Sequence, residues 1–366
     1  MTVDSARIAQ LQEAAYGLLR ELIAIPSFSR EESGTASRIE AFFRDAGVDT
    51  RRTGNNVWAR SRHFREGLPV VLLNSHHDTV RPHAAWTYDP FTPAESDGRL
   101  YGLGSNDAGG ALTALMAVFL YFHDRPGLPF NLLFAASAEE EISGVQGIEA
   151  ILPELGPIDL GIVGEPTQMH LAIAEKGLLV LDCTARGRAG HAAREEGLNA
   201  IYEALADIEW FRTYQFAQVS DFLGPVKMTV TQIQAGSQHN VVPDSCAFVV
   251  DVRTNECYSN REAYDLICAH VRSEVRARSF RLNSSRLPEA HPVVQRGLAL
   301  GRRIYGSPTT SDQALMPFPT LKIGPGDSAR SHTADEYLLR SELEEGIDLY
   351  IRLLEGLDLQ AWRFSA

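Results

Sequence analysis

Short apolar runs alternate with helical patterns over the first 167 residues, and this alternation constrains the fold more than any other feature. Residues 68–74, 130–136 and 160–163 are compact apolar runs, of the length and kind that strands buried on both faces require. Residues 111–122 and 145–152 have the apolar content of packed helices. Parallel strands are connected through such helices. This part of the chain therefore predicts a mostly parallel sheet with helices on its faces.

The pattern changes in the middle of the chain. Residues 172–186 resemble a pair of strands around Lys176-Gly177. They are followed by a helix at 198–211, strands at 226–233 and 246–253, a helix at 261–275 and a closing strand at 279–283. The order βαββαβ is that of a ferredoxin-like α+β domain.

The residues after Pro288 predict too few elements for a domain of their own. They suggest a helix at 293–305, a strand at 320–323, a loop and a last helix at 338–354. A chain of 366 residues also exceeds the usual size of one hydrophobic core. We therefore expect one domain built from residues 1–174 and 288–366, with residues 175–287 inserted as a second domain.

Charge and apolar patterning exclude several kinds of partner. The chain has 34 Lys and Arg against 47 Asp and Glu, a formal net charge of −13. A negative surface repels nucleic-acid phosphates and anionic membranes, so we expect a small-molecule partner, no nucleic acid and no membrane. The helical N-terminal pattern lacks the apolar segment of a signal peptide, and no apolar run approaches the ~20 residues of a membrane span. We expect a cytoplasmic protein.

The cysteines do not suggest a metal site. Cys183, Cys246, Cys257 and Cys268 lie in one middle stretch and never form a CxxC pair. We expect buried free thiols.

Three polar clusters directly follow the predicted strands of the first sheet. They contain, in chain order, His76-His77-Asp78, Glu139-Glu140-Glu141 and Glu165. Each alone has an ordinary explanation as a solvated strand end or an acidic turn. In open α/β sheets, however, ligands bind beyond the carboxyl ends of the strands. The shared position of the clusters favours a binding site.

Two further segments contribute Asp107 and His332. Asp107 ends the glycine-rich run YGLGSND before an apolar helix and could simply cap that helix. The run lacks the lysine and the spacing of a phosphate-binding loop. His332 ends the loop GPGDSARSH, which is uninformative by itself.

Together these side chains suit two divalent metal ions. Two histidines and three carboxylates are appropriate ligands for Zn²⁺ or Co²⁺, and a dication would relieve the repulsion among three successive acids. A bridging Asp would leave each metal one further His and one further Glu. Glu140 would then be free to act as a general base. Asp78, two residues after His76 on a strand-like backbone, could orient its ring.

The motifs SHHDTV, YGLGSNDAGG, AEEEISGVQG, GEPT and the late His332 resemble, in this order, the zinc aminoacylase/carboxypeptidase family. This metallopeptidase family includes acetylornithine deacetylases and succinyl-diaminopimelate desuccinylases. The resemblance extends from about residue 18 to residue 354. It implies a mixed, mostly parallel sheet flanked by helices, of the zinc exopeptidase type, with an inserted ferredoxin-like lid and dimerisation domain.

The resemblance also implies roles for the metal-site residues. Asp107 would bridge the two metals, with Glu140 as general base and Asp78 as the acid that orients a histidine. The remaining ligands would be His76 and Glu165 at one metal and Glu141 and His332 at the other. The Asp107–Ala108 peptide bond is often cis in such relatives.

In the middle domain the resemblance implies substrate contacts. His191 matches a histidine that stabilises the oxyanion in the active site of the partner subunit, and we expect a homodimer formed through this domain. Asn240 and Arg253 match substrate-binding positions, and the planar fork of Arg253 suits a carboxylate. The chain departs from the family at Leu103, where arginine is usual, and at Ala108-Gly109, where Met-Lys is usual.

These features predict a metal-dependent hydrolase of an N-acyl amino acid. Overall similarity favours removal of the acetyl group from N-acetyl-L-citrulline or N-acetyl-L-ornithine, in arginine biosynthesis. The alternative is a succinyl-diaminopimelate desuccinylase or a small peptidase of the same family, for which Lys176 could supply the extra cation that a succinyl carboxylate needs. A non-catalytic binding protein of this fold is disfavoured because every ligand and the base are present.

Overall fold

The chain consists of two compact units. The structure, a computed structural model, describes residues 4–194 and 196–363. Unit 1 comprises Met1–Ile173, Leu287–Tyr305 and Ser311–Ala366, and unit 2 comprises Ala174–Arg286 and Gly306–Thr310. These borders lie close to those expected from the sequence. The assignment of Gly306–Thr310 to unit 2 was not predicted.

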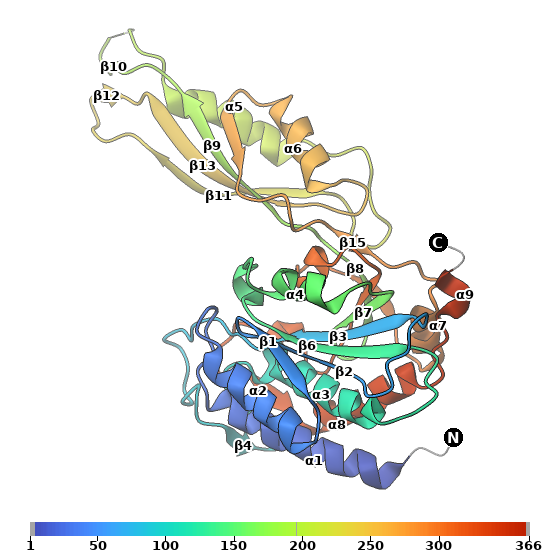
Figure 1. Cartoon of the computed structure of the whole chain (residues 1–366). Coiled ribbons are helices and arrows are strands. Elements are labelled where there is room, and N and C mark those ends of the chain that lie inside the picture. Colours follow the sequence, from blue (N-terminus) through green and yellow to red (C-terminus); the bar gives the residue numbers. More distant parts are fainter. Residues whose placement is uncertain (1–3, 195, 364–366) are drawn as a thin grey trace. The chain divides into compact units, whose positions relative to one another are not determined.

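A mixed, mostly parallel sheet forms the centre of unit 1 (Figure 1). Its strands lie in the order β1-β2-β6-β3-β7-β17-β8. Their bounds are Thr50–Thr53 (β1), Asn56–Arg60 (β2), Asn131–Ser137 (β6), Val70–His76 (β3), Leu160–Val163 (β7), Thr320–Lys322 (β17) and Leu171–Glu175 (β8). Strands β6, β3, β7 and β17 run parallel, whereas β2 and β8 are antiparallel to their neighbours. The expected α/β class is confirmed.

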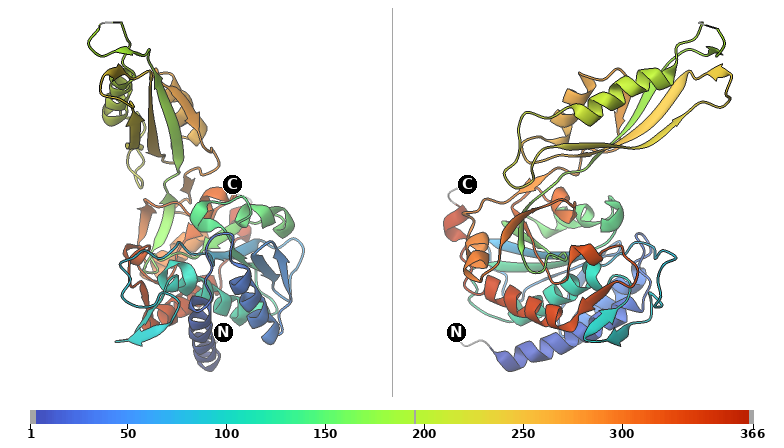
Figure 2. Two further views of the ribbon diagram at one scale, coloured as in Figure 1. Left: turned by 90° about the vertical axis from the view of Figure 1, so that its left-hand side faces the viewer. Right: turned by 180° about the vertical axis from the view of Figure 1, so that it is seen from behind.

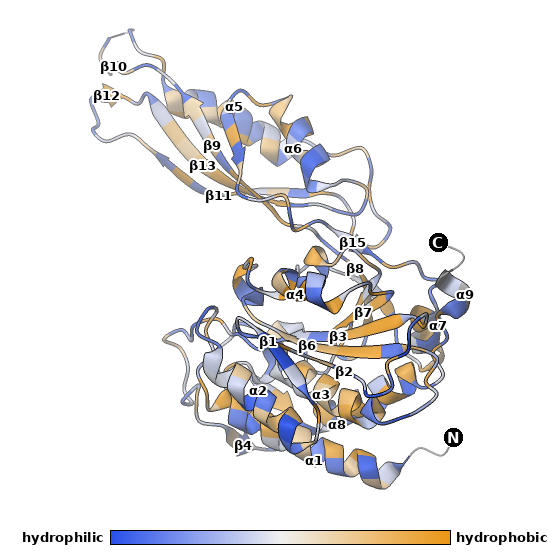
Figure 3. Ribbon diagram, in the orientation of Figure 1, coloured by the Kyte–Doolittle hydropathy of each residue, from blue (hydrophilic) through white to orange (hydrophobic). Residues whose placement is uncertain are grey.

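Helices cover both faces of this sheet, which explains why its central strands β3 and β6 are buried along their whole length and mostly apolar (Figure 3). On one face lies α3 (Gly110–His123), which packs against α1 (Ser5–Ile23) and α8 (Arg340–Leu354). Phe134 of β6 points to this side and contacts Phe43 of α2 (Ser33–Asp45). Leu133, the preceding residue, packs on the other face with α4 (Ile148–Leu155). Successive strand residues point to opposite faces, so both must be apolar.

Several boundaries in unit 1 differ from the prediction. The helix expected at 293–305 is α7 (Pro292–Ala299); Gly301 has φ +78° just after it, and the chain continues as β16 (Ile304–Ser307), which pairs with β8. The sequence did not predict α2, β1, β2 or a small sheet of β18 (Tyr337–Leu339), β5 (Arg99–Tyr101) and β4 (Ala94–Ser96). A short helix α9 (Gln360–Arg363) follows α8. None of the described helices is long and apolar enough to span a bilayer.

Unit 2 has the predicted ferredoxin-like order βαββαβ. Its elements are β9 (Leu179–Arg186), α5 (Ala200–Thr213), β11 (Lys227–Ala235), β13 (Ser245–Arg253), α6 (Asn260–Cys268) and β14 (Glu274–Ala277). The strands form an antiparallel sheet in the order β11-β13-β9-β14. A two-stranded antiparallel sheet of β10 (Gly190–His191) and β12 (Val241–Val242) lies beyond one end of that sheet (Figures 1 and 2). A two-residue strand β15 (Ser285–Arg286) pairs with Ala174 and Glu175.

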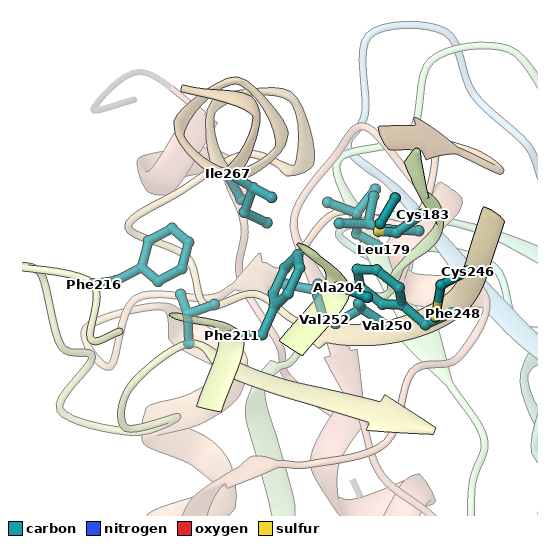
Figure 4. Close-up of a cluster of buried hydrophobic side chains, with 14 of the residues drawn as sticks. Leu179, Cys183, Ala204, Phe211, Phe216, Cys246, Phe248, Val250, Val252 and Ile267 are labelled. Atoms are coloured by element: carbon teal, nitrogen blue, oxygen red, sulfur yellow. The ribbon is translucent and has the colours of Figure 1, made fainter. Parts of the chain in front are cut away.

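Alternate residues of β9 and β13 form the core of unit 2 (Figure 4). Leu179, Leu181 and Cys183 are buried on one face of β9 and belong to the same hydrophobic cluster as Phe211 of α5 and Ile267 of α6. Such alternation is expected for a sheet covered by helices on one face only.

Three predictions for unit 2 were wrong in detail. The strands around Lys176-Gly177 are not paired with each other, because β8 belongs to the large sheet and β9 to the four-stranded one. The second helix ends at Cys268, and the closing strand is Glu274–Ala277 rather than 279–283. The carboxylate of Asp207 accepts the amides of Arg272 and Ser273 (3.1 and 2.8 Å), which holds this segment outside a helix.

The prediction of buried thiols holds for only part of the set. Cys183 and Cys246 are buried in the unit 2 core, whereas Cys257 is half-buried and Cys268 is exposed.

Candidate metal centre

The parallel strands of unit 1 bring three polar clusters to one edge of the sheet. In the register of β3, His76 lies beside Ser137 of β6 and Asn74 lies beside Val163 of β7. The turn with Glu139–Glu141 therefore starts beside His76, and Glu165 follows two residues after Val163. The common position that the sequence suggested results from this parallel pairing.

The five predicted ligands gather into two groups that share one residue. His76, Asp107 and Glu165 have ligand atoms within 4.8 Å of one another, and so have Asp107, Glu141 and His332. The two oxygens of Asp107 face different histidines. Its Oδ1 lies 3.3 Å from Nε2 of His76, and its Oδ2 lies 3.6 Å from Nε2 of His332. This arrangement suits a carboxylate that bridges two metals.

The electrostatics of the cluster fit bound dications. Burial, together with the nearby Glu165, Asp312 and Glu141, raises the pKa of Glu140 well above its usual value. Burial and the neighbouring Asp107 likewise raise the pKa of Glu165 to about 8. Carboxylates crowded in this way repel one another, and a dication among them stabilises their ionised forms. Imidazole and carboxylate donors suit zinc or cobalt.

The ring of His76 is held so that Nε2 faces the centre. Nδ1 lies 3.0 Å from the backbone oxygen of Asp78 and 3.4 Å from its Oδ1. Burial disfavours the charged ring, but Glu140, Asp107 and Asp78 outweigh this and raise the pKa of His76 well above its usual value. Asp78 thus occupies the orienting position that the sequence predicted.

Asp78 has a second contact that the sequence did not suggest. Its carboxylate accepts the backbone amides of Glu140 and Glu141, both at 3.1 Å, and the hydroxyl of Ser29 at 2.7 Å. One buried acid therefore positions both the His76 ring and the turn that follows β6.

Each of the three successive acids has a different environment. Glu139 is turned toward its own loop, where Oε2 accepts the amide of Gln146 (3.4 Å). Oε2 of Glu140 lies 3.8 Å from Nε2 of His76, and Glu140 belongs to neither ligand group. Oε2 of Glu141 lies 3.0 Å from Nε2 of His332. The structure thus places Glu141 in one of the two candidate ligand groups and Glu140 beside them, outside both groups.

Comparison with known proteins identifies the family of the chain. Residues 72–356 match the model of peptidase family M20/M25/M40. The chain belongs to this family.

Curated relatives that match over most of the chain include desuccinylases. The succinyl-diaminopimelate desuccinylase of Stenotrophomonas maltophilia strain K279a is 28% identical over 375 residues, which cover 94% of this chain and 99% of that protein. The corresponding protein of Paracidovorax citrulli is 26% identical over 384 residues, with 94% and 98% covered. These matches do not confirm the acetylornithine deacetylase subtype.

Solved M20 structures share the fold. A tripeptidase from Staphylococcus aureus has a TM-score of 0.75 at 19% identity, with 95% of this chain and 99% of that chain covered. A dinuclear metal-binding peptidase of the M20 family from Bacillus subtilis has a TM-score of 0.72 at 16% identity, with 96% and 99% covered. The protein is thus an M20 metallohydrolase that acts on amide bonds, and it shares its fold with a dinuclear metal-binding peptidase.

Two buried acids at this M20 centre were missed by the sequence analysis. The carboxylate of Asp312 accepts Nδ2 of Asn74 (2.9 Å) and Oγ of Ser137 (2.6 Å), and burial raises its pKa to about 6. Glu336 accepts three backbone amides from the segment that ends at Asp107. Neither acid follows a predicted strand. The only available signal for Glu336 was its place four residues after His332.

The Asp107–Ala108 peptide bond is cis, as the family resemblance implied.

The predicted substrate-binding residues of the M20 enzyme lie in unit 2. His191 is in the β10 strand, and its Nδ1 accepts the amide of Ala193 (3.1 Å). Asn240 is exposed, and its backbone oxygen accepts the amide of Ala192. Nζ of Lys176 donates to the backbone oxygen of Pro225 at 2.9 Å. The roles of these residues stay predictions.

Arg253, at the end of β13, already has a carboxylate partner. Its Nε and Nη2 donate to the two oxygens of Asp251 at 2.8 and 3.0 Å. A substrate carboxylate would therefore have to share this guanidinium with Asp251.

Proposed function

We propose that the protein hydrolyses the amide bond of an N-succinylated amino acid, as a succinyl-diaminopimelate desuccinylase does. The observation that carries the proposal is the similarity to desuccinylases over 94% of this chain and 99% of the Stenotrophomonas protein. The sequence analysis held this activity as its alternative. It is better supported than deacetylation of N-acetylcitrulline in arginine biosynthesis, which uses the same metal centre and the same base.

A cluster of cations in unit 2 supports an acidic acyl group. Lys227 of β11 and Arg253 of β13 are directly opposite each other in the sheet register. Burial, Lys227 and Arg253 all lower the pKa of Lys176. Like charges opposite each other destabilise a sheet, and because Arg253 is already paired with Asp251, Lys176 and Lys227 are the cations that an anionic ligand would pair with here. A succinyl group has a carboxylate at its end, whereas an acetyl group has none.

The residues of the metal centre suggest how the amide is cleaved. Two divalent metals would be held by His76 and Glu165, by Glu141 and His332, and by the shared ligand Asp107. When bound, they would lower the pKa of a water molecule and polarise the acyl carbonyl. Glu140 removes the proton from the attacking water and passes it to the nitrogen of the departing amine. Burial favours the protonated form of Glu140, which it must adopt between these two steps.

Stabilisation of the oxyanion is assigned to His191 from a partner subunit. Exposed apolar residues of unit 2 support a homodimer formed through this unit: Leu198, Tyr202, Leu205, Ile233 and Val241. In addition, β11 is an edge strand of its sheet and can pair with another strand. A cytoplasmic location stays a prediction.

A substrate panel tests the proposal. The zinc-loaded protein would be assayed with N-succinyl-L,L-diaminopimelate, N-acetylcitrulline, N-acetylornithine and a tripeptide. We expect the succinylated substrate to have the highest kcat/KM. A higher kcat/KM for N-acetylcitrulline would contradict the proposal and identify the protein as a deacetylase.

Lys176→Met separates recognition of the acyl group from the chemistry. A hydrogen bond to a charged group contributes about 1.5–3 kcal/mol, so we expect kcat/KM for the succinylated substrate to fall by roughly 10- to 150-fold. Hydrolysis of an acetylated substrate should change little. An equal loss of kcat/KM with both substrates would show that Lys176 does not bind the acyl carboxylate.

A further inference from the structure

We propose that Glu336 is a positioning residue of the metal centre: it holds the backbone of the loop that carries Asp107, and through Asp107 it sets the affinity for both metals. Asp107 is the residue that the two ligand groups share. A displacement of this one side chain would therefore disturb both sites together.

Three backbone amides of the loop point to one carboxylate. Oε1 of Glu336 accepts the amides of Asn106 and Asp107, both at 2.8 Å, and Oε2 accepts the amide of Gly104 at 3.1 Å. Glu336 is only 2% exposed. All three hydrogen bonds that the structure gives this carboxylate come from backbone amides, so it acts on the loop and not on another side chain.

Burying a carboxyl group is costly unless its oxygens are hydrogen-bonded. The amides of the loop supply these hydrogen bonds. The loop is restrained in turn, because its buried amides would have no hydrogen-bond partners if it moved away from Glu336. Asp107 lies in extended backbone (φ −117°, ψ 97°), and the next residue, Ala108 (φ −119°, ψ 31°), is also outside the helical region. The amide of Asp107, held at 2.8 Å, is therefore a direct restraint on where the Asp107 carboxylate points.

Strand pairing places Glu336 opposite the loop. The residue immediately precedes β18, whose Tyr337 pairs with Tyr101 of β5, and the loop starts directly after β5. The backbone oxygen of Glu336 also accepts the amide of Gly102 at 3.1 Å. The side chain thus extends from a fixed strand end toward the loop.

The same segment joins the loop to a second metal ligand. His332 lies four residues before Glu336, and its ring faces Oδ2 of Asp107 at 3.6 Å. Asn106 is also tied to this part of the chain, because its side chain donates to the backbone oxygen of Asp327 (3.1 Å) and accepts the amide of Asp327 (2.9 Å). Residues 327–336 therefore position the shared ligand and supply one of the others.

The neighbouring acid offers a matched control. Asp335 also accepts three hydrogen bonds, from the amides of Thr87 and Tyr88 (2.8 and 3.1 Å) and from the hydroxyl of Thr87 (2.6 Å). These contacts hold a different loop, which contributes no predicted ligand. Asp335→Asn therefore weakens a set of three hydrogen bonds without touching the segment of Asp107.

The experiment measures metal binding rather than turnover. Wild type, Glu336→Gln and Asp335→Asn would be freed of metal with a chelator and titrated with Co²⁺, followed by calorimetry and by the visible absorption of the bound ion. Loss of residues that orient metal ligands typically weakens metal affinity by about 10- to 100-fold, and we expect a loss of this size for both sites in Glu336→Gln. Asp335→Asn should bind Co²⁺ as the wild type does.

A purely structural role predicts a different result. In that case Glu336→Gln would lower the melting temperature of the metal-free protein and still bind Co²⁺ with wild-type affinity and an unchanged spectrum, which would overturn the proposal. Glu336→Asp keeps the charge but shortens the side chain, so we expect an intermediate affinity.

Hydrogen exchange provides a test that needs no variant. In the metal-free wild-type protein, the amides of Gly104, Asn106 and Asp107 should exchange slowly because Glu336 holds them. If these amides exchange as fast as those of exposed loops until metal is added, the metals order the loop and Glu336 does not.

Discussion

Within a single turn, three neighbouring glutamates face three different partners. Glu139 bonds to the amide of Gln146, Glu140 lies beside His76, and Glu141 lies beside His332. All three side chains are glutamates of equal length, so only their backbone positions separate their roles. A shift of the turn by one residue would therefore exchange the predicted base and the predicted metal ligand.

Three single substitutions test this separation. We expect Glu140→Gln to keep its metal but to lose about 10²- to 10⁴-fold in kcat, because general-base catalysis contributes a factor of this size. Glu141→Gln should lose metal, since it removes a predicted ligand. Metal content by emission spectroscopy and steady-state kinetics would be measured on the same samples.

Glu139→Gln is the control for those variants. Its carboxylate is outside both ligand groups, so metal content and kcat should stay near wild type. A near-normal kcat in Glu140→Gln would contradict the assignment of Glu140 as the general base.

Among the secondary-structure elements, α7 contains a buried histidine at its N-cap. Nδ1 of His291 accepts the amide of Val293 (3.3 Å), and the ring is fully buried. Burial lowers the pKa of His291 to about 4. The folded state therefore keeps this ring neutral at a pH where an unfolded histidine, with a pKa of about 6.5, is already protonated.

This histidine should make stability depend on pH in one window. Between about pH 6.5 and 4 the unfolded chain binds the extra proton, so the stabilisation present above pH 6.5 is lost as the pH falls. His291→Asn keeps a capping acceptor but cannot titrate. Urea unfolding at several pH values should show the wild type losing about 1–3 kcal/mol relative to the variant across this window. Parallel pH profiles of the two proteins would refute the assignment.

The helices of unit 1 also contain two glycines with opposite steric surroundings. A Cβ at Gly17 of α1 would meet nothing within 4 Å, whereas a Cβ at Gly109, just before α3, would lie 2.4 Å from the backbone oxygen of Gly104. Both glycines have negative φ, so backbone strain does not distinguish them.

Alanine at these two positions should therefore shift stability in opposite directions. We expect Gly17→Ala to raise the free energy of unfolding by about 0.5–1 kcal/mol, because alanine loses less entropy in a helix. Gly109→Ala should lower it by about 1–3 kcal/mol through overpacking. Urea titrations of the metal-free proteins measure both free energies of unfolding. Equal effects of the two substitutions would show that the loop before α3 can move to accommodate the added methyl group.

For the whole molecule, the exposed apolar residues of unit 2 lead to a prediction about assembly. Tyr202 and Leu205 of α5 are 70% and 52% exposed. If a second copy covers them, the double variant Tyr202→Glu/Leu205→Glu should sediment as a monomer while the wild type sediments as a dimer, because each charge would have to be buried unpaired. Activity should fall with the dimer, since His191 is assigned to the partner's site.

Leu298→Glu is the control for assembly. Leu298 is an exposed apolar residue of α7 in unit 1 (38% exposed), so its substitution should leave the dimer intact. A wild-type protein that sediments as a monomer at micromolar concentration would contradict the proposed assembly.

Local sequence determined much of this protein. The run at Leu160–Val163 is a strand with the predicted bounds, and the βαββαβ order of unit 2 was predicted from periodicity. His76, Glu141 and Glu165 were also within reach, because they follow buried strands and parallel strands end at one edge of a sheet, whereas the roles of Asp107 and His332 came from the family resemblance. These conclusions need only the chain on either side of each residue.

The tertiary structure decided what depends on residues far apart in the chain. β8 and β9 are neighbours in sequence but belong to different sheets, because each pairs with strands from later in the chain. Glu336 meets Asp107 across 229 positions, and Asp312 meets Asn74 across 238. A buried acid finds its hydrogen-bond donors only after the sheet has assembled around it. The sequence therefore pointed to the metal ligands, and only the fold identified the acids that hold them in place.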